Sequence, residues 1–259
     1  MNALAGKLLS FDFDGTLYGS FQNPCVSQEC VELIEQFSRS GAWWGINTGR
    51  SYDFLQEGLA EAGFLSLPDF VVVKEREVFF RKEGGYEADT SWNERCATLH
   101  RQMYDRELDL IQSVKAFVQN KTLAEWVSED GDEAGVIATS VEEMDQIVQF
   151  IEMALEPVTG VDYLRSTIYL RFTHADFHKG TALKHVANRL QLAVEDTFAM
   201  GDGENDLGML NLRYACRLAC PANAVELVKK RVKDADGYVA GAEVSEGVVE
   251  ALKYHFLRD

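Results

Sequence analysis

Two short acidic segments stand at the ends of apolar runs of the sequence. Asp12 and Asp14 stand at the C-terminal end of the run 7–13, and Gly201–Asp206 (GDGEND) follows the run 197–200. Side chains two residues apart on a strand share a face, so the first two carboxylates can address one substrate atom. Carboxylates that converge on one crevice repel each other, and hard cations such as Mg²⁺ prefer these oxygen ligands. The two segments therefore favour a Mg²⁺ site.

Two further segments offer groups that hold anions. In Asn47–Ser51 (NTGRS), the Thr48 hydroxyl and free backbone N–H groups can hold an anionic oxygen at a helix N-terminus. Lys179, in the segment HKG, offers a compact positive charge that can counter a phosphate. A DxD turn, a TGR or a KG also arises by chance in an acidic chain. All four segments in this order, each at the edge of an expected strand or helix, favour a phosphate site.

The elements around these segments predict a parallel sheet. Apolar runs at 7–13, 42–46 and 70–73 read as buried strands, and amphipathic runs at 27–40 and 51–62 read as helices between them. Strands that alternate with helices are typical of an α/β fold with helices on both faces of the sheet. Such Rossmann-like, doubly wound sheets bind ligands beyond the carboxyl ends of their strands, where Asp12 and Asp14 stand.

The alternation stops after the third strand and resumes near Lys179. The intervening pattern is a helical stretch at 92–120 and a helix at 141–155, with strand pairs at 123–128 with 136–139 and at 161–164 with 167–172. After it, helices at 181–190, 206–212 and 225–233 alternate with strands at 197–200, 216–219 and 237–240. We therefore expect a discontinuous core, 1–80 and 176–259, and an inserted α+β domain at 81–175.

Composition and charge exclude several classes of protein. A hydrophobic fraction of 46% and only 4 prolines in 259 residues exclude a disordered or collagen-like chain. The formal charge of −17 repels nucleic acids and anionic membranes, so no nucleic-acid or membrane partner is expected. No run approaches the length of a membrane helix, and the N-terminus meets acidic residues too early for a secretory signal. Five cysteines without a CxxC pair favour a reducing, cytoplasmic location.

The four segments together resemble the motifs of the haloacid dehalogenase-like phosphohydrolases. Those motifs are DxDGT, a Ser or Thr after the second strand, a Lys, and GDxxxD. Only 33 residues separate Asp14 from Thr48, whereas 130 separate Thr48 from Lys179, so the chain is most similar to the branch with a large cap in this gap. That branch includes Cof-like sugar phosphatases and sucrose-phosphate phosphatase. Many of its members carry Asn-Gly after the third strand, where this chain has Lys74–Glu77 (KERE).

The resemblance implies a Mg²⁺-dependent phosphomonoesterase that acts on a small phosphate ester, with a sugar phosphate expected. Asp12 would be the nucleophile that forms an aspartyl-phosphate, and Asp14 the acid and base, in a catalytic set completed by Thr48 and Lys179. The cap would supply the leaving-group pocket. The metal ligands would be Asp12, the main-chain carbonyl of Asp14, Asp202 and Asp206. The phosphate-binding groups would be the backbone at Phe13, together with Thr48, Gly49, Arg50, Lys179 and Asn205.

Other functions stay open at this point. A related capped branch contains phosphomutases, and a non-catalytic metabolite-binding module could keep the same fold. Loss of Asp12, Asp14 or Lys179 would be expected in such a module, and all three are present. Dehalogenation is disfavoured because Asp14, which protonates an alkoxide, is retained. His174 and His178 stand close to Lys179 and have no assigned role.

Overall fold

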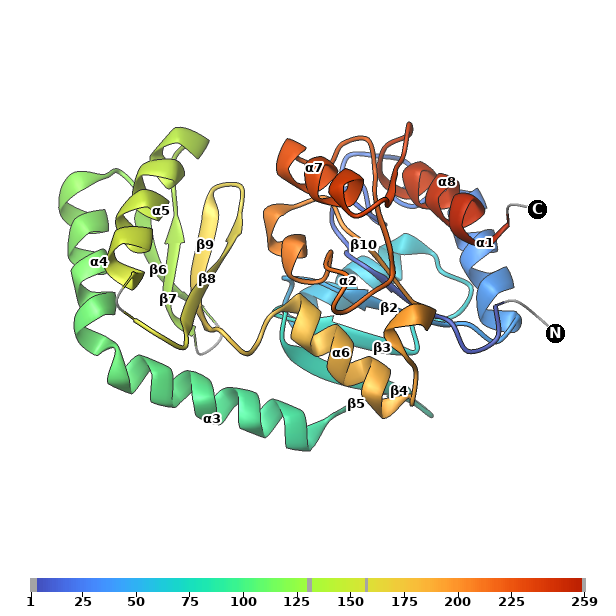
Figure 1. The fold of residues 1–259 in the computed structure, drawn as a ribbon, viewed down its shortest axis with the longest axis horizontal. Coiled ribbons are helices and arrows are strands. Elements are labelled where there is room, and N and C mark those ends of the chain that lie inside the picture. The colour runs from blue at the N-terminus through green and yellow to red at the C-terminus, as the bar shows by residue number, and fades with distance from the viewer. Residues whose placement is uncertain (1–3, 130–131, 157, 258–259) are drawn as a thin grey trace. The chain divides into compact units, whose positions relative to one another are not determined.

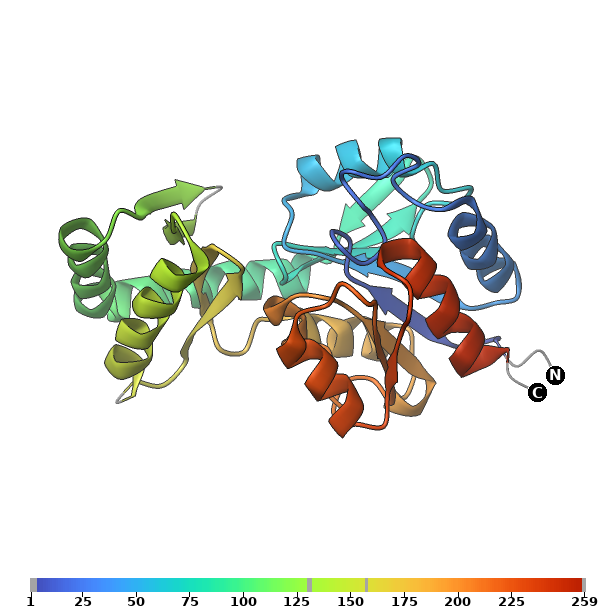
Figure 2. The ribbon, with the colours of Figure 1, turned by 90° about the horizontal axis from the view of Figure 1, so that it is seen from above.

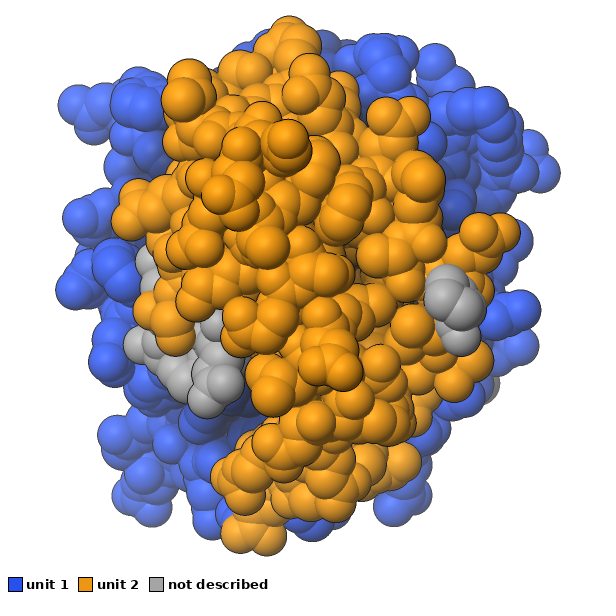
Figure 3. All heavy atoms as spheres, turned by 90° about the vertical axis from the view of Figure 1, so that its left-hand side faces the viewer, with its two compact units in different colours: residues 1–93, 179–259 blue, residues 94–178 orange. Residues whose placement is uncertain are grey.

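The computed structural model describes residues 4–129, 132–156 and 158–257. The chain forms two compact units, which Figure 3 shows in different colours. The core unit contains residues 1–93 and 179–259, and the inserted unit contains residues 94–178. In the part of the chain that the structure describes, no helix is both long enough and apolar enough to span a membrane.

The core unit is built on a sheet in which β1 (Leu8–Phe11) lies in the interior (Figure 1). The two neighbours of β1, β10 (Thr197–Met200) and β2 (Trp43–Asn47), both pair with it in parallel. All three strands therefore end at the same edge of the sheet. The strand order is β12-β11-β10-β1-β2-β3-β4-β5. The remaining strands are β3 (Phe70–Val73), β4 (Glu77–Lys82), β5 (Gly85–Ala88), β11 (Arg217–Cys220) and β12 (Tyr238–Val239).

Helices cover both faces of this sheet because its central strands are apolar on both sides. Leu9 and Phe11 of β1 join one buried cluster, and Leu8 joins a second cluster on the opposite face, as the period of two requires. The two helix layers lie on opposite sides of the sheet (Figure 2). One layer is α1 (Gln28–Arg39), α2 (Tyr52–Ala62) and α8 (Val244–Phe256). The other is α6 (Lys179–Arg189), the 3₁₀ helix η2 (Glu204–Gly208) and α7 (Glu226–Asp234); a short 3₁₀ helix, η1 (Val194–Asp196), precedes β10.

Local signals fix α2 directly behind the expected phosphate-binding loop. The Ser51 side chain accepts a hydrogen bond from the backbone N–H of Phe54 and so caps the first turn. The helix ends at Gly63, whose φ of 68° is left-handed and favours glycine. The segment Asn47–Arg50 is thereby held between the end of β2 and the start of α2.

The inserted unit is an antiparallel four-stranded sheet with helices, in the order β6-β7-β9-β8 (Figure 1). Its buried core includes Val114, Met144, Ile147 and Phe172. Helix α3 starts within the core unit and carries the chain into the inserted unit. The elements are α3 (Thr90–Arg106), α4 (Leu108–Lys121), β6 (Glu125–Glu129), β7 (Asp132–Ile137), α5 (Val141–Leu155), β8 (Val161–Ser166) and β9 (Tyr169–His174).

The predicted α/β class with a parallel sheet is confirmed, and several details differ. Residues 81–93, placed in the insert by the division at residue 80, group with the core unit because β4 and β5 extend its sheet as antiparallel strands. The helical stretch at 92–120 is two helices, α3 and α4, which break at Glu107 so that Met103 and Ile111 both reach one core. The expected helix at 206–212 is the shorter η2, and α8 is an element that the sequence analysis missed.

A glycine in the central sheet gives a test of this packing. A Cβ added to Gly45 in β2 would lie 2.4 Å from the buried ring of Phe70 in β3. Gly45→Ala should therefore lower the free energy of unfolding by about 1–3 kcal/mol, because a fully buried ring has to move. Gly241→Ala is the control, since its Cβ would make an ordinary contact at 3.6 Å with Glu250. Urea denaturation of both variants checks this, and equal losses would contradict it.

Candidate active site

The loop after β1 presents Asp12 at the carboxyl edge of the sheet. The backbone N–H of Asp12 still donates to the carbonyl of Met200, so Asp12 extends the pairing with β10 before the chain turns. The turn needs Gly15, whose φ is 76°. A Cβ at Gly15 would also lie 2.4 Å from a carboxylate oxygen of Asp202. The glycine therefore lets the loop after β10 approach the loop after β1.

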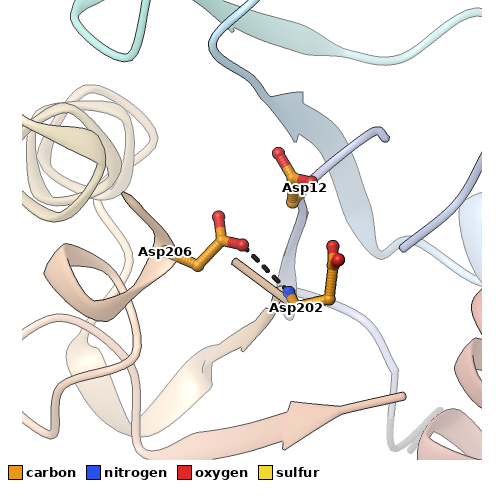
Figure 4. Close-up of side chains that lie close together, drawn as sticks. All are labelled: Asp12, Asp202 and Asp206. Atoms are coloured by element: carbon orange, nitrogen blue, oxygen red, sulfur yellow. Dashed lines mark hydrogen bonds between the residues drawn. The ribbon is translucent and has the colours of Figure 1, made fainter. Parts of the chain in front are cut away.

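Three carboxylates meet at this edge. One oxygen from each of Asp12, Asp202 and Asp206 lies within 4.8 Å of the others, and the three side chains surround a common space (Figure 4). The second oxygen of Asp206 accepts hydrogen bonds of 2.9 Å from the backbone N–H groups of Asp202 and Gly203. The side chain of Asp206 thus fixes the loop that carries Asp202. Asp12 and Asp206 are buried, with 6% and 1% of their surface exposed.

Lys179 brings a positive charge into this cluster. It is the first residue of α6, its side chain is fully buried, and its Nζ donates to Asp12 Oδ1 and to Asp206 Oδ1, both at 2.6 Å. The carbonyl of Lys179 accepts a hydrogen bond of 2.9 Å from the side chain of Asn47, at the end of β2. The start of α6 is therefore fixed to the neighbouring strand as well as to the acidic cluster.

Burial controls the charges of these groups. Burial raises the pKa of Asp12 well above its ordinary value, and the charge of Asp206 raises it further, against the effect of Lys179. Burial, and then the charge of Asp206, raises the pKa of Asp202 to about 7. Burial alone would lower the pKa of Lys179, but Asp12 and Asp206 outweigh it and the pKa is raised. The ammonium of Lys179 therefore stays protonated, but its single positive charge does not balance the negative charge of the carboxylates.

The donor set of this cluster fits a divalent cation. When ionised, three carboxylates against one ammonium leave two negative charges unbalanced among these four side chains. Carboxylate oxygens are the ligands that Mg²⁺ takes in proteins. Thr16 donates a hydrogen bond of 2.8 Å to Asp202 Oδ1 and leaves the other oxygen of that carboxylate available. A Mg²⁺ ion would restore charge balance at this position.

Thr48 lies buried at the neighbouring strand end. Its backbone N–H donates to the carbonyl of Val72, and its hydroxyl accepts a hydrogen bond from the backbone N–H of Arg50 at 3.1 Å. Asn205, in η2, donates through its side-chain amide to Glu75 Oε1 at 2.7 Å. A Cβ at Gly49 would lie 3.5 Å from the same oxygen of Glu75. Glu75 therefore joins the Thr48–Gly49 loop and Asn205 in one place.

Glu75 is a site residue that the sequence analysis noted only as a departure from the resembling branch. It is buried, with 3% of its surface exposed, and it lies in a turn where Lys74 and Glu75 have left-handed φ values of 48° and 64°. The two backbone N–H groups of the turn donate to the carbonyls of Arg50 and Thr48. Non-glycine residues with positive φ are uncommon and are enriched at functional sites. A run of charged residues after the third strand was the available signal.

The other residues singled out in the sequence lie outside the acidic cluster. Asp14 and Arg50 belong to the core unit, whereas His174 and His178 belong to the inserted unit. Asp14 lies beside Arg50, which donates to both of its carboxylate oxygens, at 2.7 and 2.6 Å. His174 belongs to the inserted unit, where its backbone N–H donates to the ring of His100. Among the described residues, neither His174 nor His178 belongs to a cluster of metal-ligating side chains. The structure thus brings together, within the core unit, the predicted residues Asp12, Thr48, Gly49, Lys179, Asp202, Asn205 and Asp206, with Asp14 and Arg50 paired beside them.

Comparison with known proteins identifies the class to which this fold and site belong. The sequence profile of the haloacid dehalogenase-like hydrolases matches residues 69–252, which is more than half of the chain. The chain belongs to the haloacid dehalogenase-like hydrolases, and the family predicted from the four motifs is confirmed. The matched region includes Lys179, Asp202 and Asp206 but starts after Asp12, Asp14 and Thr48, so for the last three the geometry above is the additional support.

The relatives of this chain include several proteins named as phosphatases. A phosphoglycolate phosphatase from Methanopyrus kandleri is 25% identical over 254 residues, covering 95% of this chain and 96% of that enzyme. One from Archaeoglobus fulgidus is 36% identical over 95 residues, which is 37% of this chain and only 40% of that enzyme. Among solved structures, the sucrose-phosphatase from Synechocystis sp., in complex with sucrose and phosphate, has a TM-score of 0.73 at 18% identity, covering 96% of this chain and 98% of that one. The last likeness concerns the fold.

Removal of the buried ammonium tests the architecture of the site. Lys179→Met should lower the free energy of unfolding by about 3–5 kcal/mol, because Asp12 and Asp206 stay buried without their cation. Lys253→Met is the control, since Lys253 pairs with Glu29 at the surface, where an ion pair contributes less than about 1 kcal/mol. Denaturation is followed in chelator, so that no metal ion replaces the ammonium. Equal effects of the two substitutions would refute this account of the site.

Proposed function

We propose that the protein is a Mg²⁺-dependent phosphomonoesterase that hydrolyses a small phosphorylated metabolite through an aspartyl-phosphate on Asp12. The observation that carries this proposal is the convergence of Asp12, Lys179, Asp202 and Asp206 at one edge of the sheet, from segments nearly 200 residues apart. Membership of a hydrolase family and relatives named as phosphatases support the same reaction.

The first step forms a covalent bond to the enzyme. An oxygen of Asp12 attacks phosphorus, the bond from phosphorus to the ester oxygen breaks, and the alcohol leaves with a proton from Asp14. Lys179, already bonded to Asp12, holds the nucleophile in place and counters the negative charge of the phosphate. The phosphoryl oxygens would accept hydrogen bonds from the Thr48 hydroxyl, the side chain of Asn205 and the backbone N–H groups of Phe13 and Gly49.

The second step regenerates the enzyme. Water attacks the phosphorus of the aspartyl-phosphate, Asp14 takes the proton of that water, and the bond from phosphorus to the Asp12 oxygen breaks to release phosphate. Mg²⁺, held by Asp12, Asp202, Asp206 and the main-chain carbonyl of Asp14, would neutralise charge on the transferring phosphoryl group. An anionic carboxylate attacks an anionic ester here, so the repulsion between them has to be reduced by positive charge. Lys179 and the metal ion would supply this charge.

The substrate class that we propose is a sugar phosphate or a similarly small ester. The support is the match in fold to a sucrose-phosphatase and to the subclass IIB sugar phosphatase BT4131, the latter with a TM-score of 0.67 and 18% identity, covering 96% of this chain and 98% of that one. Relatives named phosphoglycolate phosphatases extend the class to small phosphorylated acids. The chain's charge of −17 argues against a polyanionic partner such as a nucleic acid.

Release of phosphate tests the reaction. The purified protein should release inorganic phosphate from members of a panel of sugar phosphates, 2-phosphoglycolate and p-nitrophenyl phosphate. Asp12→Asn should lower turnover at least about 1,000-fold, since removal of a nucleophile leaves only binding and electrostatic effects. Asp234→Asn, at an exposed ion pair in α7, is the control and should keep full activity. A positional isomer formed without free phosphate would instead indicate a mutase. Full activity of Asp12→Asn would show that Asp12 is not the nucleophile.

Metal binding has a readout besides activity. Chelator should abolish turnover, and Mg²⁺ at about 100 times its dissociation constant should raise the melting temperature by about 5–10 °C. Asp202→Asn should lose most of this rise, whereas Asn at this position can still accept the hydrogen bond from Thr16. Differential scanning fluorimetry measures both proteins. An unchanged rise in Asp202→Asn would show that the metal binds elsewhere.

A further inference from the structure

Asp14 is held differently from the other acidic residues of the site. Its side chain is about half exposed, at 46%, and it lies outside the cluster of Asp12, Asp202 and Asp206. Arg50 binds it with two donors, Nε to Oδ2 at 2.7 Å and Nη2 to Oδ1 at 2.6 Å. Such a two-point contact fixes both the place and the plane of a carboxylate.

Arg50 is itself held by contacts on several sides. Its Nη1 donates to the carbonyl of Phe54 in the first turn of α2 at 3.1 Å. Its guanidinium carbon lies 4.8 Å from the ring centre of Phe13 and 5.1 Å from that of Tyr18. Cations are attracted to aromatic faces at these distances. These contacts therefore hold the guanidinium in one position and orientation.

The residues around the Arg50 guanidinium are themselves held by the fold of the core unit. Phe13 and Tyr18 stack on each other, with ring centres 4.9 Å apart and planes 13° apart, and the Tyr18 hydroxyl donates to Glu61 in α2. Gly58, also in α2, leaves the space that the guanidinium fills, since a Cβ there would lie 2.5 Å from Arg50 Nη1 and 2.6 Å from the Phe13 ring. Residues on the β1 loop, the β2 end and α2 thus combine to place one carboxylate.

We infer that Arg50 is a positioning residue that holds the Asp14 carboxylate where proton transfer to the leaving group takes place. The inference rests on the proposed function. A half-exposed aspartate on a loop otherwise samples several rotamers, and misplacement of a reacting group by about 1 Å can reduce a rate on the order of 100-fold. Protonated Asp14 gives its proton to the ester oxygen as the bond to phosphorus breaks, and it later takes a proton from water.

This role differs from direct binding of phosphate by Arg50, which the resemblance implies. Three of its five N–H groups already donate, two to Asp14 and one to the carbonyl of Phe54. A positioning role predicts that the loss of Arg50 matters only where the leaving group needs a proton. A phosphate-binding role predicts an equal loss for every ester.

The experiment compares leaving groups. Turnover of glycerol phosphate, whose alkoxide needs protonation, is measured beside that of p-nitrophenyl phosphate, whose phenolate does not. Arg50→Ala should lower kcat for the alkyl ester on the order of 100-fold and that for the aryl ester less than about 5-fold. Arg50→Lys cannot make the two-point contact, so its kcat for the alkyl ester should lie between those of the wild type and of Arg50→Ala. Arg81→Ala is the control, because Arg81 pairs with Asp69 away from the site, and both of its rates should stay unchanged.

Two further variants separate positioning from folding. Asp14→Asn should show the same selectivity for the alkyl ester, and adding Arg50→Ala to it should cause less than about a twofold further loss. Gly58→Ala displaces the guanidinium and presses on the buried ring of Phe13, so it should reproduce the alkyl-selective loss at a lower melting temperature. Retained turnover of the aryl ester then shows that the variant is folded.

Equal losses for both esters, additivity with Asp14→Asn, or faster turnover in Arg50→Ala would each overturn the positioning role. Absence of phosphate release by the wild-type protein would instead refute the proposed function.

Discussion

The ammonium of Lys179 lies between Asp12 and Asp206, fully buried, with both contacts at 2.6 Å. Buried charges are tolerated only when they are paired and hydrogen-bonded, so this one cation determines how closely the two acidic loops can approach. Asp206 in turn holds the backbone of Asp202. The order of β10, β1 and β2 places these loops at one edge, but the lysine makes their approach stable.

Much of this arrangement follows from local sequence patterns. The strands at 70–73 and 197–200 and the helix at 141–155 have the bounds that apolar periodicity predicts, because runs buried on both faces or along one stripe leave a strong signal. Asp12 and Lys179 were found because four short polar segments occur in one order, each at the edge of an expected strand or helix. The grouping of their side chains then follows from the parallel order of the strands.

Other parts depend on contacts that no local pattern encodes. Strands β4 and β5 carry Glu77, Arg81, Lys82 and Glu87, which hide their alternation, and they form because they extend an existing sheet edge. The missed helix α8 buries Val248 and Leu252 against the same face as α1. The partner of Arg50 is a matter of side-chain geometry, and the place of Glu75 depends on a left-handed turn that its sequence does not favour.

The left-handed turn at Glu75 combines a strained backbone with a side-chain contact that depends on it. Left-handed backbone at a non-glycine residue costs on the order of 1 kcal/mol, so glycine at position 75 would relax the main chain. The same replacement would remove the carboxylate that holds the amide of Asn205. The main chain and the contact with Asn205 therefore make opposite demands on this residue. A polar group that loses its partner in a buried position costs about 1–3 kcal/mol, so the carboxylate at position 75 offsets the strain of the backbone that places it.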